Sequence, residues 1–240
     1  MKALEIQEIE TYYGTSHVLH GLSLEVSEGD IVCLLGRNGA GKTTTIRSIM
    51  GMIPPQRGSI KIFGEEVGGW RPNRIFSKGV RIVPQGRHIF PMLSVEENLH
   101  IALMGMPASE LSKETEKAYQ MFPILEERRR QKGRSLSGGQ LQMLAIARAV
   151  MGNVRLLLMD EPSEGLAPII IQQIEKTILQ LKQKGITVLL AEQNLQSALR
   201  VGDYHYIIDN GTDVFRGGQK DLEANEEVKI KYLGVGTSET

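Results

Sequence analysis

The stretch Ile31-Val32-Cys33-Leu34-Leu35-Gly36-Arg37-Asn38-Gly39-Ala40-Gly41-Lys42-Thr43 decides the fold of this chain. Its first five residues are uniformly apolar, which is typical of a strand buried on both faces, as in a parallel sheet. A glycine-rich turn follows, and a helical stretch runs from about Lys42 to Met50. Strand, glycine-rich turn and helix in this order form the structural context that a phosphate-binding loop requires.

The loop is predicted to hold phosphate groups through its backbone. Glycines allow several N–H groups to converge on one anion, and the helix N-terminus adds its positive end. Lys42 can reach the β- and γ-phosphates of a nucleoside triphosphate, and the Thr43 hydroxyl can ligate Mg²⁺. The predicted nucleotide contacts of the loop are Gly36, Arg37, Asn38, Gly39, Ala40, Gly41, Lys42, Thr43 and Thr44.

A second apolar run, Leu156–Met159, ends in two adjacent carboxylates, Asp160 and Glu161. Ligand sites of α/β proteins lie at the carboxyl ends of the strands. Asp160 can hold Mg²⁺ through the water shell of the metal, and Glu161 can accept a proton from an attacking water. Taken alone, the pair fits two solvated charges at a turn; the phosphate loop favours the catalytic interpretation.

A third motif, Leu136-Ser137-Gly138-Gly139-Gln140, precedes a helical pattern. Its glycines and helix N-terminus make a second anion-binding surface, formed by Ser137, Gly138, Gly139 and Gln140. One chain thus carries two surfaces that bind phosphate. We expect a head-to-tail dimer in which each ATP lies between the phosphate loop of one chain and the Ser137–Gln140 loop of the other.

The rest of the chain predicts an α/β fold in one domain over residues 1–240. Alternating strands near the N-terminus predict an antiparallel β subdomain, and capped helical patterns predict an inserted helical subdomain over residues 90–151. The nucleotide-binding core then comprises about 1–89 and 152–233, and a small polar tail over 234–240 is expected to be flexible. Asn210-Gly211 predicts a type I′ hairpin turn.

Composition excludes several classes of protein. The 28 basic residues balance the 28 acidic ones, which argues against a dedicated nucleic-acid-binding protein. The longest aliphatic runs have about five residues, whereas a membrane span needs about 20. A GTPase switch would need a guanine-reading Asn-Lys-x-Asp motif, which the sequence lacks.

In its motifs the chain resembles the ATP-binding cassette (ABC) ATPases over nearly its whole length. The resemblance implies that Gln85 links Mg²⁺, the attacking water and a transmembrane partner, and that Tyr13 stacks on adenine, with Tyr12 as a possible substitute. Within the family, the chain looks like the ATPase subunit of branched-chain amino acid uptake systems. The matching stretches are Leu35–Ile49, Val83–Leu99, Gln142–Ala149, Asp160–Ile170, Leu189–Asn194 and Tyr232-Leu233-Gly234.

Two positions depart from the usual family pattern. Gln193 stands where most cassettes carry a histidine that contacts the γ-phosphate, and Ala167 ends a loop that usually ends in aspartate. A glutamine can donate an N–H bond to phosphate but cannot carry charge. Gln193 also occurs in chains of the branched-chain subgroup, whereas Ala167 implies that communication between the two sites of a dimer differs in detail.

The resemblance implies an ATPase that uses ATP and Mg²⁺ to drive a membrane importer. Its expected partners are a second cassette, identical or related, integral membrane permease subunits and, indirectly, a periplasmic solute-binding protein. It also implies a peripheral position on the cytoplasmic face of the membrane. The urea-uptake ATPase, a cassette for another small solute and a non-transport ABC ATPase remain alternatives.

Overall fold

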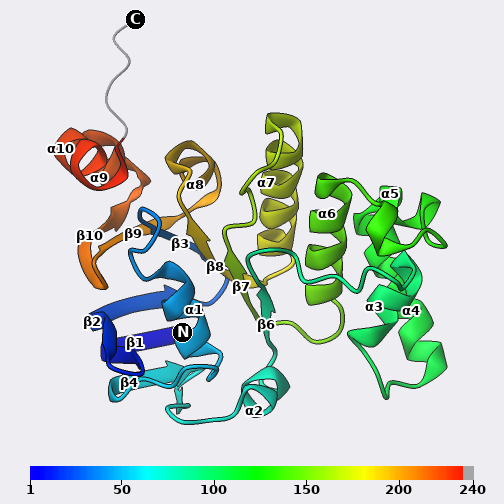
Figure 1. The fold of residues 1–240 in the computed structure, drawn as a ribbon, viewed down its shortest axis with the longest axis horizontal. Helices are drawn as coiled ribbons and strands as arrows, with labels where there is room; N and C mark the ends of the chain where they lie inside the picture. The colour runs from blue at the N-terminus through cyan, green and yellow to red at the C-terminus, as the bar shows by residue number, and fades with distance from the viewer. Residues whose placement is uncertain (235–240) are drawn as a thin grey trace, which may run out of the picture.

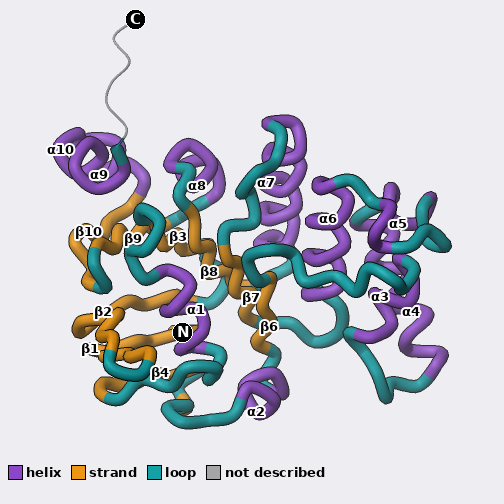
Figure 2. Tube along the Cα trace, viewed as in Figure 1, coloured by secondary structure: helices purple, strands orange, loops and turns teal. Residues whose placement is uncertain are grey.

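The computed structural model describes residues 1–234, in two β-sheets flanked by helices (Figures 1 and 2). A four-stranded antiparallel sheet has the order β2-β1-β4-β5, and a six-stranded sheet has the order β10-β9-β3-β8-β7-β6. The strands are β1 (Lys2–Tyr13), β2 (Ser16–Ser27), β3 (Ile31–Leu35), β4 (Arg57–Ile62), β5 (Glu65–Glu66), β6 (Val80–Val83), β7 (Leu156–Asp160), β8 (Thr187–Glu192), β9 (Tyr204–Asp209) and β10 (Thr212–Gly218).

Helices cover the six-stranded sheet and extend beyond its β6 edge (Figure 1). They are α1 (Lys42–Ile49), α2 (Pro72–Ser77), α3 (Val95–Ile101), α4 (Ala108–Met121), α5 (Pro123–Glu127), α6 (Gly138–Ala149), α7 (Pro168–Gln183), α8 (Leu195–Val201), α9 (Gln219–Ala224) and α10 (Glu226–Val228), with a 3₁₀ turn at Gly133–Ser135 and a π-helical turn at Lys229–Leu233. Among the helices of residues 1–234, none combines the length and hydropathy that a bilayer crossing requires.

Strand β3 lies at the centre of the larger sheet and is buried along its whole length. It pairs in parallel with β8 on one side and β9 on the other. Ile31, Cys33 and Leu35 pack into a core shared with α7, α8 and the α3–α6 helices, whereas Val32 and Leu34 pack into a second core against the antiparallel sheet and α1. The uniformly apolar sequence therefore fills two cores from one strand, as expected for a central parallel strand.

Helices α3 to α6 form one group, at the end of the molecule opposite β10 (Figure 1). Capping boxes start both α3 and α6: the side chain of Ser94 accepts the amide N–H of Glu97, and that of Ser137 accepts the amide N–H of Gln140. Helix α4 begins at Ala108, directly after its N-cap residue Pro107.

The hairpin between β9 and β10 confirms the turn predicted at Asn210-Gly211. Both residues have a positive φ, 46° and 76°, as a type I′ turn requires. The turn also supports the phosphate loop, because the Gly211 amide donates to the Ala40 carbonyl at 2.9 Å. The flexible tail predicted over 234–240 lies, apart from Gly234, outside the described residues.

Candidate functional site

The phosphate loop connects β3 to α1 and presents its backbone at the carboxyl edge of the parallel sheet. Two glycines are required by its geometry. A side chain at Gly36 would lie 2.6 Å from the Ile208 carbonyl oxygen, and Gly41 has a φ of 115°, which L side chains rarely adopt. The loop thus turns tightly against β9 and delivers Lys42 to the first turn of α1.

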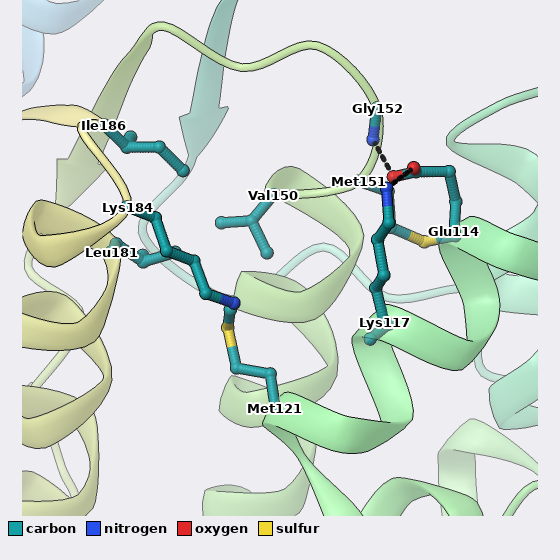
Figure 3. A pocket seen from close by; sticks show the side chains of 10 residues that line it. Glu114, Lys117, Met121, Val150, Met151, Gly152, Leu181, Lys184 and Ile186 are labelled. Atoms are coloured by element: carbon teal, nitrogen blue, oxygen red, sulfur yellow. Dashed lines mark hydrogen bonds and ion pairs between the residues drawn. The ribbon is translucent and has the colours of Figure 1, made fainter.

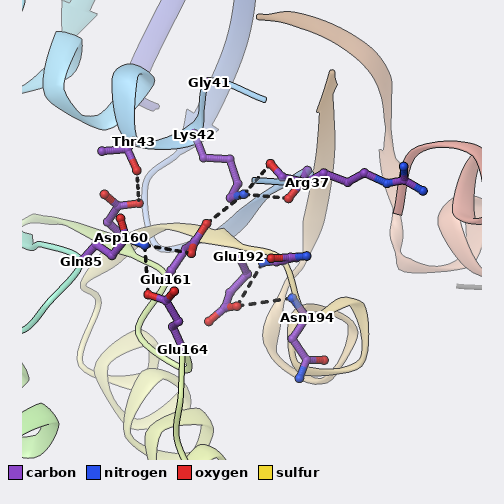
Figure 4. A network of polar contacts seen from close by, with 12 residues as sticks. Arg37, Gly41, Lys42, Thr43, Gln85, Asp160, Glu161, Glu164, Glu192 and Asn194 are labelled. Atoms are coloured by element: carbon purple, nitrogen blue, oxygen red, sulfur yellow. Dashed lines mark hydrogen bonds and ion pairs between the residues drawn. The ribbon is translucent and has the colours of Figure 1, made fainter. Parts of the chain in front are cut away.

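Lys42 is almost completely buried and folds back over the loop (Figure 4). Its Nζ donates to the carbonyl oxygens of Gly36 at 2.7 Å and Arg37 at 3.0 Å. The same ammonium lies 2.9 Å from Oε1 of Glu161, with both side chains less than a tenth exposed. The two groups that the sequence assigns to phosphate binding and to water activation are therefore paired with each other.

Asp160 ends β7 and faces the start of α1. The Thr43 hydroxyl donates to its Oδ1 at 3.1 Å, so the predicted metal ligands of the two elements are adjacent. Burial raises the pKa of the Asp160 carboxyl, and the hydrogen bond from Thr43 partly opposes this effect. Mg²⁺ prefers oxygen ligands such as hydroxyl and carboxylate groups, so Thr43 and Asp160 fit the metal.

Gln85 follows β6. It is the third residue predicted to ligate Mg²⁺, and its side chain reaches the carboxylate of Glu161. Its amide nitrogen donates to Glu161 Oε2 at 3.3 Å and to Glu164 Oε2 at 2.9 Å (Figure 4). Glu161 adopts a positive φ of 48°, which turns the chain at the end of β7 and directs its carboxylate toward Lys42. A conformation that is costly for a residue other than glycine is often found at functional positions.

An open groove of about 430 Å³ runs beside the loop and is lined by half of the predicted site residues. Tyr13 is two-fifths exposed, and its hydroxyl accepts a hydrogen bond from Arg47 at 3.3 Å. Val18 adds an apolar contact that sequence reasoning missed. The groove is lined by Tyr13, Val18, Asn38, Gly39, Gly41, Lys42, Thr43, Thr44, Gln85 and Glu161.

The Ser137–Gln140 loop forms the N-terminus of α6 but does not line this groove. A side chain added at Gly139 would lie 2.9 Å from Ile170 at the start of α7, and one at Gly138 would meet the Arg87 guanidinium at 3.5 Å. The loop is thus seated on α7 and beside the segment after Gln85. Within one chain, the two predicted anion-binding surfaces are separate.

Gln193 also stays outside the groove: it is exposed, in the turn between β8 and α8. Its neighbour Glu192 is buried and accepts the backbone N–H group of Ser163. Glu192 also accepts the N–H groups of Gln193 and Asn194, in the turn that follows it (Figure 4). Sequence reasoning missed Glu164 and Glu192. The signal available for Glu192 was a charged residue directly after an apolar strand, one position before Gln193.

A smaller cavity of about 140 Å³ lies between α4 and the C-terminal ends of α6 and α7 (Figure 3). Glu114 at its rim accepts the Gly152 amide at 2.9 Å and pairs with Lys117. None of the predicted site residues lines it, so the groove beside the phosphate loop is the candidate nucleotide site.

Comparison with known proteins agrees with this assignment. Residues 19–164 match the family model described as ABC transporter. The chain is 43% identical to the high-affinity branched-chain amino acid transport ATP-binding protein BraG of Pseudomonas aeruginosa, over 96% of this chain and 99% of that protein. It is 33% identical to the lipopolysaccharide export system ATP-binding protein LptB of Escherichia coli, over 98% of each.

Solved structures show the same architecture. A nucleotide-free ATP-binding cassette from an ABC transporter superposes with a TM-score of 0.85 at 28% identity, covering 98% of this chain and all of that one. A cassette in its ADP conformation gives a TM-score of 0.83 at 29% identity, covering 95% and 97%. Sequence, fold and the phosphate-loop site agree, and the chain belongs to the ABC transporter family as one of its ATP-hydrolysing, nucleotide-binding cassettes.

Proposed function

We propose that this cassette powers the import of branched-chain amino acids by binding and hydrolysing ATP in the groove beside the phosphate loop. The observation that carries the chemistry is the convergence of Lys42, Thr43, Asp160, Glu161 and Gln85 from three separate segments of the chain. The 43% identity to BraG over almost both full lengths supports the choice of solute.

In the proposed mechanism, arrival of ATP breaks the contact between Lys42 and Glu161. Phosphate oxygens compete for the Lys42 ammonium, which is then held by the triphosphate together with the loop amides. The Glu161 carboxylate loses its counter-ion and is free to accept a proton from the attacking water. Nucleotide binding therefore both places the substrate and activates the base.

The side chains around the phosphates fit a magnesium ion. Thr43 and Asp160 present oxygen atoms 3.1 Å apart, and Gln85 lies beside them through its contacts with Glu161 and Glu164. Thr43 and Asp160 would hold the ion, whose positive charge would offset the negative charge that develops on the transferred phosphoryl group. Tyr13 and Val18 also line the groove, and there an adenine ring would find an aromatic surface.

The site is completed, in this proposal, by a second cassette, either identical or related. The Ser137–Gln140 loop lies outside its own groove, so it is available to cap the γ-phosphate that a partner holds. Gln193 of the chain that holds the ATP donates an N–H bond to this γ-phosphate, in place of the charged histidine of most cassettes. Closure on ATP and reopening after hydrolysis would transmit work to permease subunits at the cytoplasmic face of the membrane.

The contact region for those permease subunits is proposed at the segment after Gln85. Phe90 and Met92 are about half exposed there, although the neighbouring backbone is fixed by Asn98, which bonds both the N–H and the carbonyl of Phe90. An exposed apolar pair on a rigid segment suits a protein–protein contact.

Two tests separate the chemistry from the solute. ATP hydrolysis by the purified chain, lost in Glu161→Gln, tests the site. Uptake of labelled leucine, urea and other small solutes by host cells with and without the gene tests the importer; unchanged leucine uptake would contradict the solute. The 33% identity to LptB makes lipopolysaccharide export the second candidate, which defective export without an uptake defect would support.

A further inference from the structure

Glu192 is a buried carboxylate that the proposed mechanism leaves without a role. It is 2% exposed, at the last position of β8, where its strand neighbour is Leu35, the residue before the phosphate loop. Its bonds come from backbone amides, and no cation of residues 1–234 pairs with it. Burying a charge in this way is costly, so a position that retains one calls for a reason.

The two carboxylate oxygens of Glu192 bond two different segments. Oε1 accepts the amide N–H of Ser163 at 3.2 Å, in the turn that carries Glu161 and Glu164. Oε2 accepts the amides of Gln193 at 3.2 Å and Asn194 at 3.4 Å, in the turn after β8. One side chain therefore joins the turn of the catalytic base to the turn of the residue assigned to the γ-phosphate.

The two residues before Ser163 offer no free amide for this connection. The Glu161 amide already donates to the Ala191 carbonyl at 2.9 Å, continuing the β7–β8 pairing. Pro162 has no N–H group, so Ser163 carries the next free amide of this turn. A carboxylate accepts at both oxygens, whereas a neutral amide side chain accepts at one and donates at the other.

We propose that Glu192 is a positioning residue, which fixes Gln193 relative to Glu161 so that γ-phosphate contact and water activation occur in one geometry. This inference rests on the proposed roles of Glu161 and Gln193. A displacement of about 1 Å between reacting groups can lower the rate about 100-fold, so a lock of this kind acts on turnover. Nucleotide affinity depends mainly on the phosphate loop and changes little.

The test compares Glu192→Gln with the wild-type full-length chain in steady-state ATP hydrolysis with Mg²⁺. The substituted side chain has the same volume as glutamate but only one accepting oxygen. Its NH₂ group must face the backbone N–H groups of one of the two turns, so that turn loses its hydrogen bond. We expect kcat to fall at least about tenfold and KM for ATP to stay within about twofold. Amide exchange at Ser163 or at Gln193 should accelerate in the same variant.

Glu175→Gln is the matched control. Glu175 on α7 is also buried, and it bonds Ser197 and Arg200 of α8 without touching either turn. We expect this variant to lose thermal stability but keep kcat within about twofold of wild type. Glu192→Asp, which keeps the charge but shortens the reach, provides a second variant with an expected loss of kcat if Glu192→Gln does not fold.

Wild-type kcat in a folded Glu192→Gln, or a rise in KM with kcat unchanged, would overturn the positioning role. An equal loss of kcat in Glu175→Gln would overturn it as well, since any weakening around α8 would then suffice. These outcomes are distinct from failure of the proposed function. In that case the wild-type chain would not hydrolyse ATP, or Glu161→Gln would hydrolyse it at the wild-type rate.

Discussion

The ammonium group of Lys42 lies 2.9 Å from the carboxylate of Glu161, and both side chains are less than a tenth exposed. The cation proposed to bind phosphate and the carboxylate proposed as the catalytic base therefore neutralise each other. A buried ion pair contributes little net stability, but either member is costly to leave alone. This arrangement keeps the base occupied until a triphosphate takes the lysine.

Replacement of Glu161 by Gln should abolish turnover while leaving ATP binding intact. A positioned general base contributes about 10²- to 10⁴-fold to a rate, so kcat should fall by at least about 100-fold. The stalled protein should accumulate as an ATP-bound dimer, measurable by light scattering with ATP and Mg²⁺. Glu164→Gln is the control, because Glu164 contacts Gln85 but not Lys42, and its effect should be smaller. Hydrolysis at the wild-type rate in Glu161→Gln would refute the base assignment.

Lys42→Ala should lower both the affinity for ATP and the free energy of unfolding measured without nucleotide. The substitution removes the phosphate contact and leaves Glu161 buried without its counter-ion, at a cost of about 3–5 kcal/mol in the free energy of unfolding. Adding Glu161→Gln should restore much of that stability without restoring ATP affinity. Denaturant unfolding of the single and double variants measures the coupling. An additive double variant would mean that the ion pair carries no interaction energy.

Asp160→Asn should stabilise the fold by an amount that depends on pH, and it should abolish magnesium-dependent ATP hydrolysis. Burial raises the pKa of Asp160 in the folded state, so folding disfavours the charged carboxylate. Between the ordinary value of 3.8 and the raised value, the folded state binds more protons, and wild-type stability falls as pH rises. Asp160→Asn does not lose stability in this way. The free energy of unfolding of the variant, measured relative to wild type, should therefore rise through that pH window, and the difference should remain at neutral pH.

Unfolding curves of the nucleotide-free and metal-free proteins from about pH 4 to pH 7 measure the difference. Magnesium-dependent ATP hydrolysis should be lost in the same variant, because the amide no longer offers a charged oxygen beside Thr43. A stability difference that stays constant with pH would show that Asp160 titrates normally in the folded protein.

Much of the fold was predictable because, in the larger sheet, the local sequence pattern of a segment agrees with its place in the fold. The apolar run Ile31–Leu35 is long enough for one strand and too short for a helix, and it proved to be the central strand. Asn210-Gly211 specified its turn through backbone conformation alone. Helix α2 was not predicted, because its six residues begin with Pro72 and present one buried side chain, Ile75, so the pattern has no period to detect.

The site was predictable where sequence neighbours are also spatial neighbours, and not elsewhere. Lys42 and Thr43 follow from the loop motif, but the contact of Lys42 with Glu161 joins residues far apart in sequence. Glu192 shows the limit most clearly. Its role depends on Pro162 lacking an N–H and on the Ser163 amide lying within 3.2 Å, and neither fact is visible from the residue itself.

Gly139→Ala should impair ATP-dependent pairing of cassettes through a steric effect inside one chain. The added Cβ would lie within 3.0 Å of the Cδ1, Cγ1 and Cγ2 atoms of Ile170, so the contact between the start of α6 and Ile170 must shift. That shift displaces the Ser137–Gln140 loop from the position its capping box defines. ATP-dependent dimerisation, followed by scattering in a hydrolysis-deficient Glu161→Gln background, should weaken.

Ile170→Ala in the same chain then discriminates between two reasons for the glycine. If the overlap with Ile170 is the cause, removing that side chain makes room for the new methyl group and dimerisation recovers. If the backbone of Gly139 must instead approach the nucleotide of the partner, the double variant stays as weak as Gly139→Ala. We expect recovery, because Gly139 packs directly on Ile170 in the single chain, before any partner or nucleotide is present.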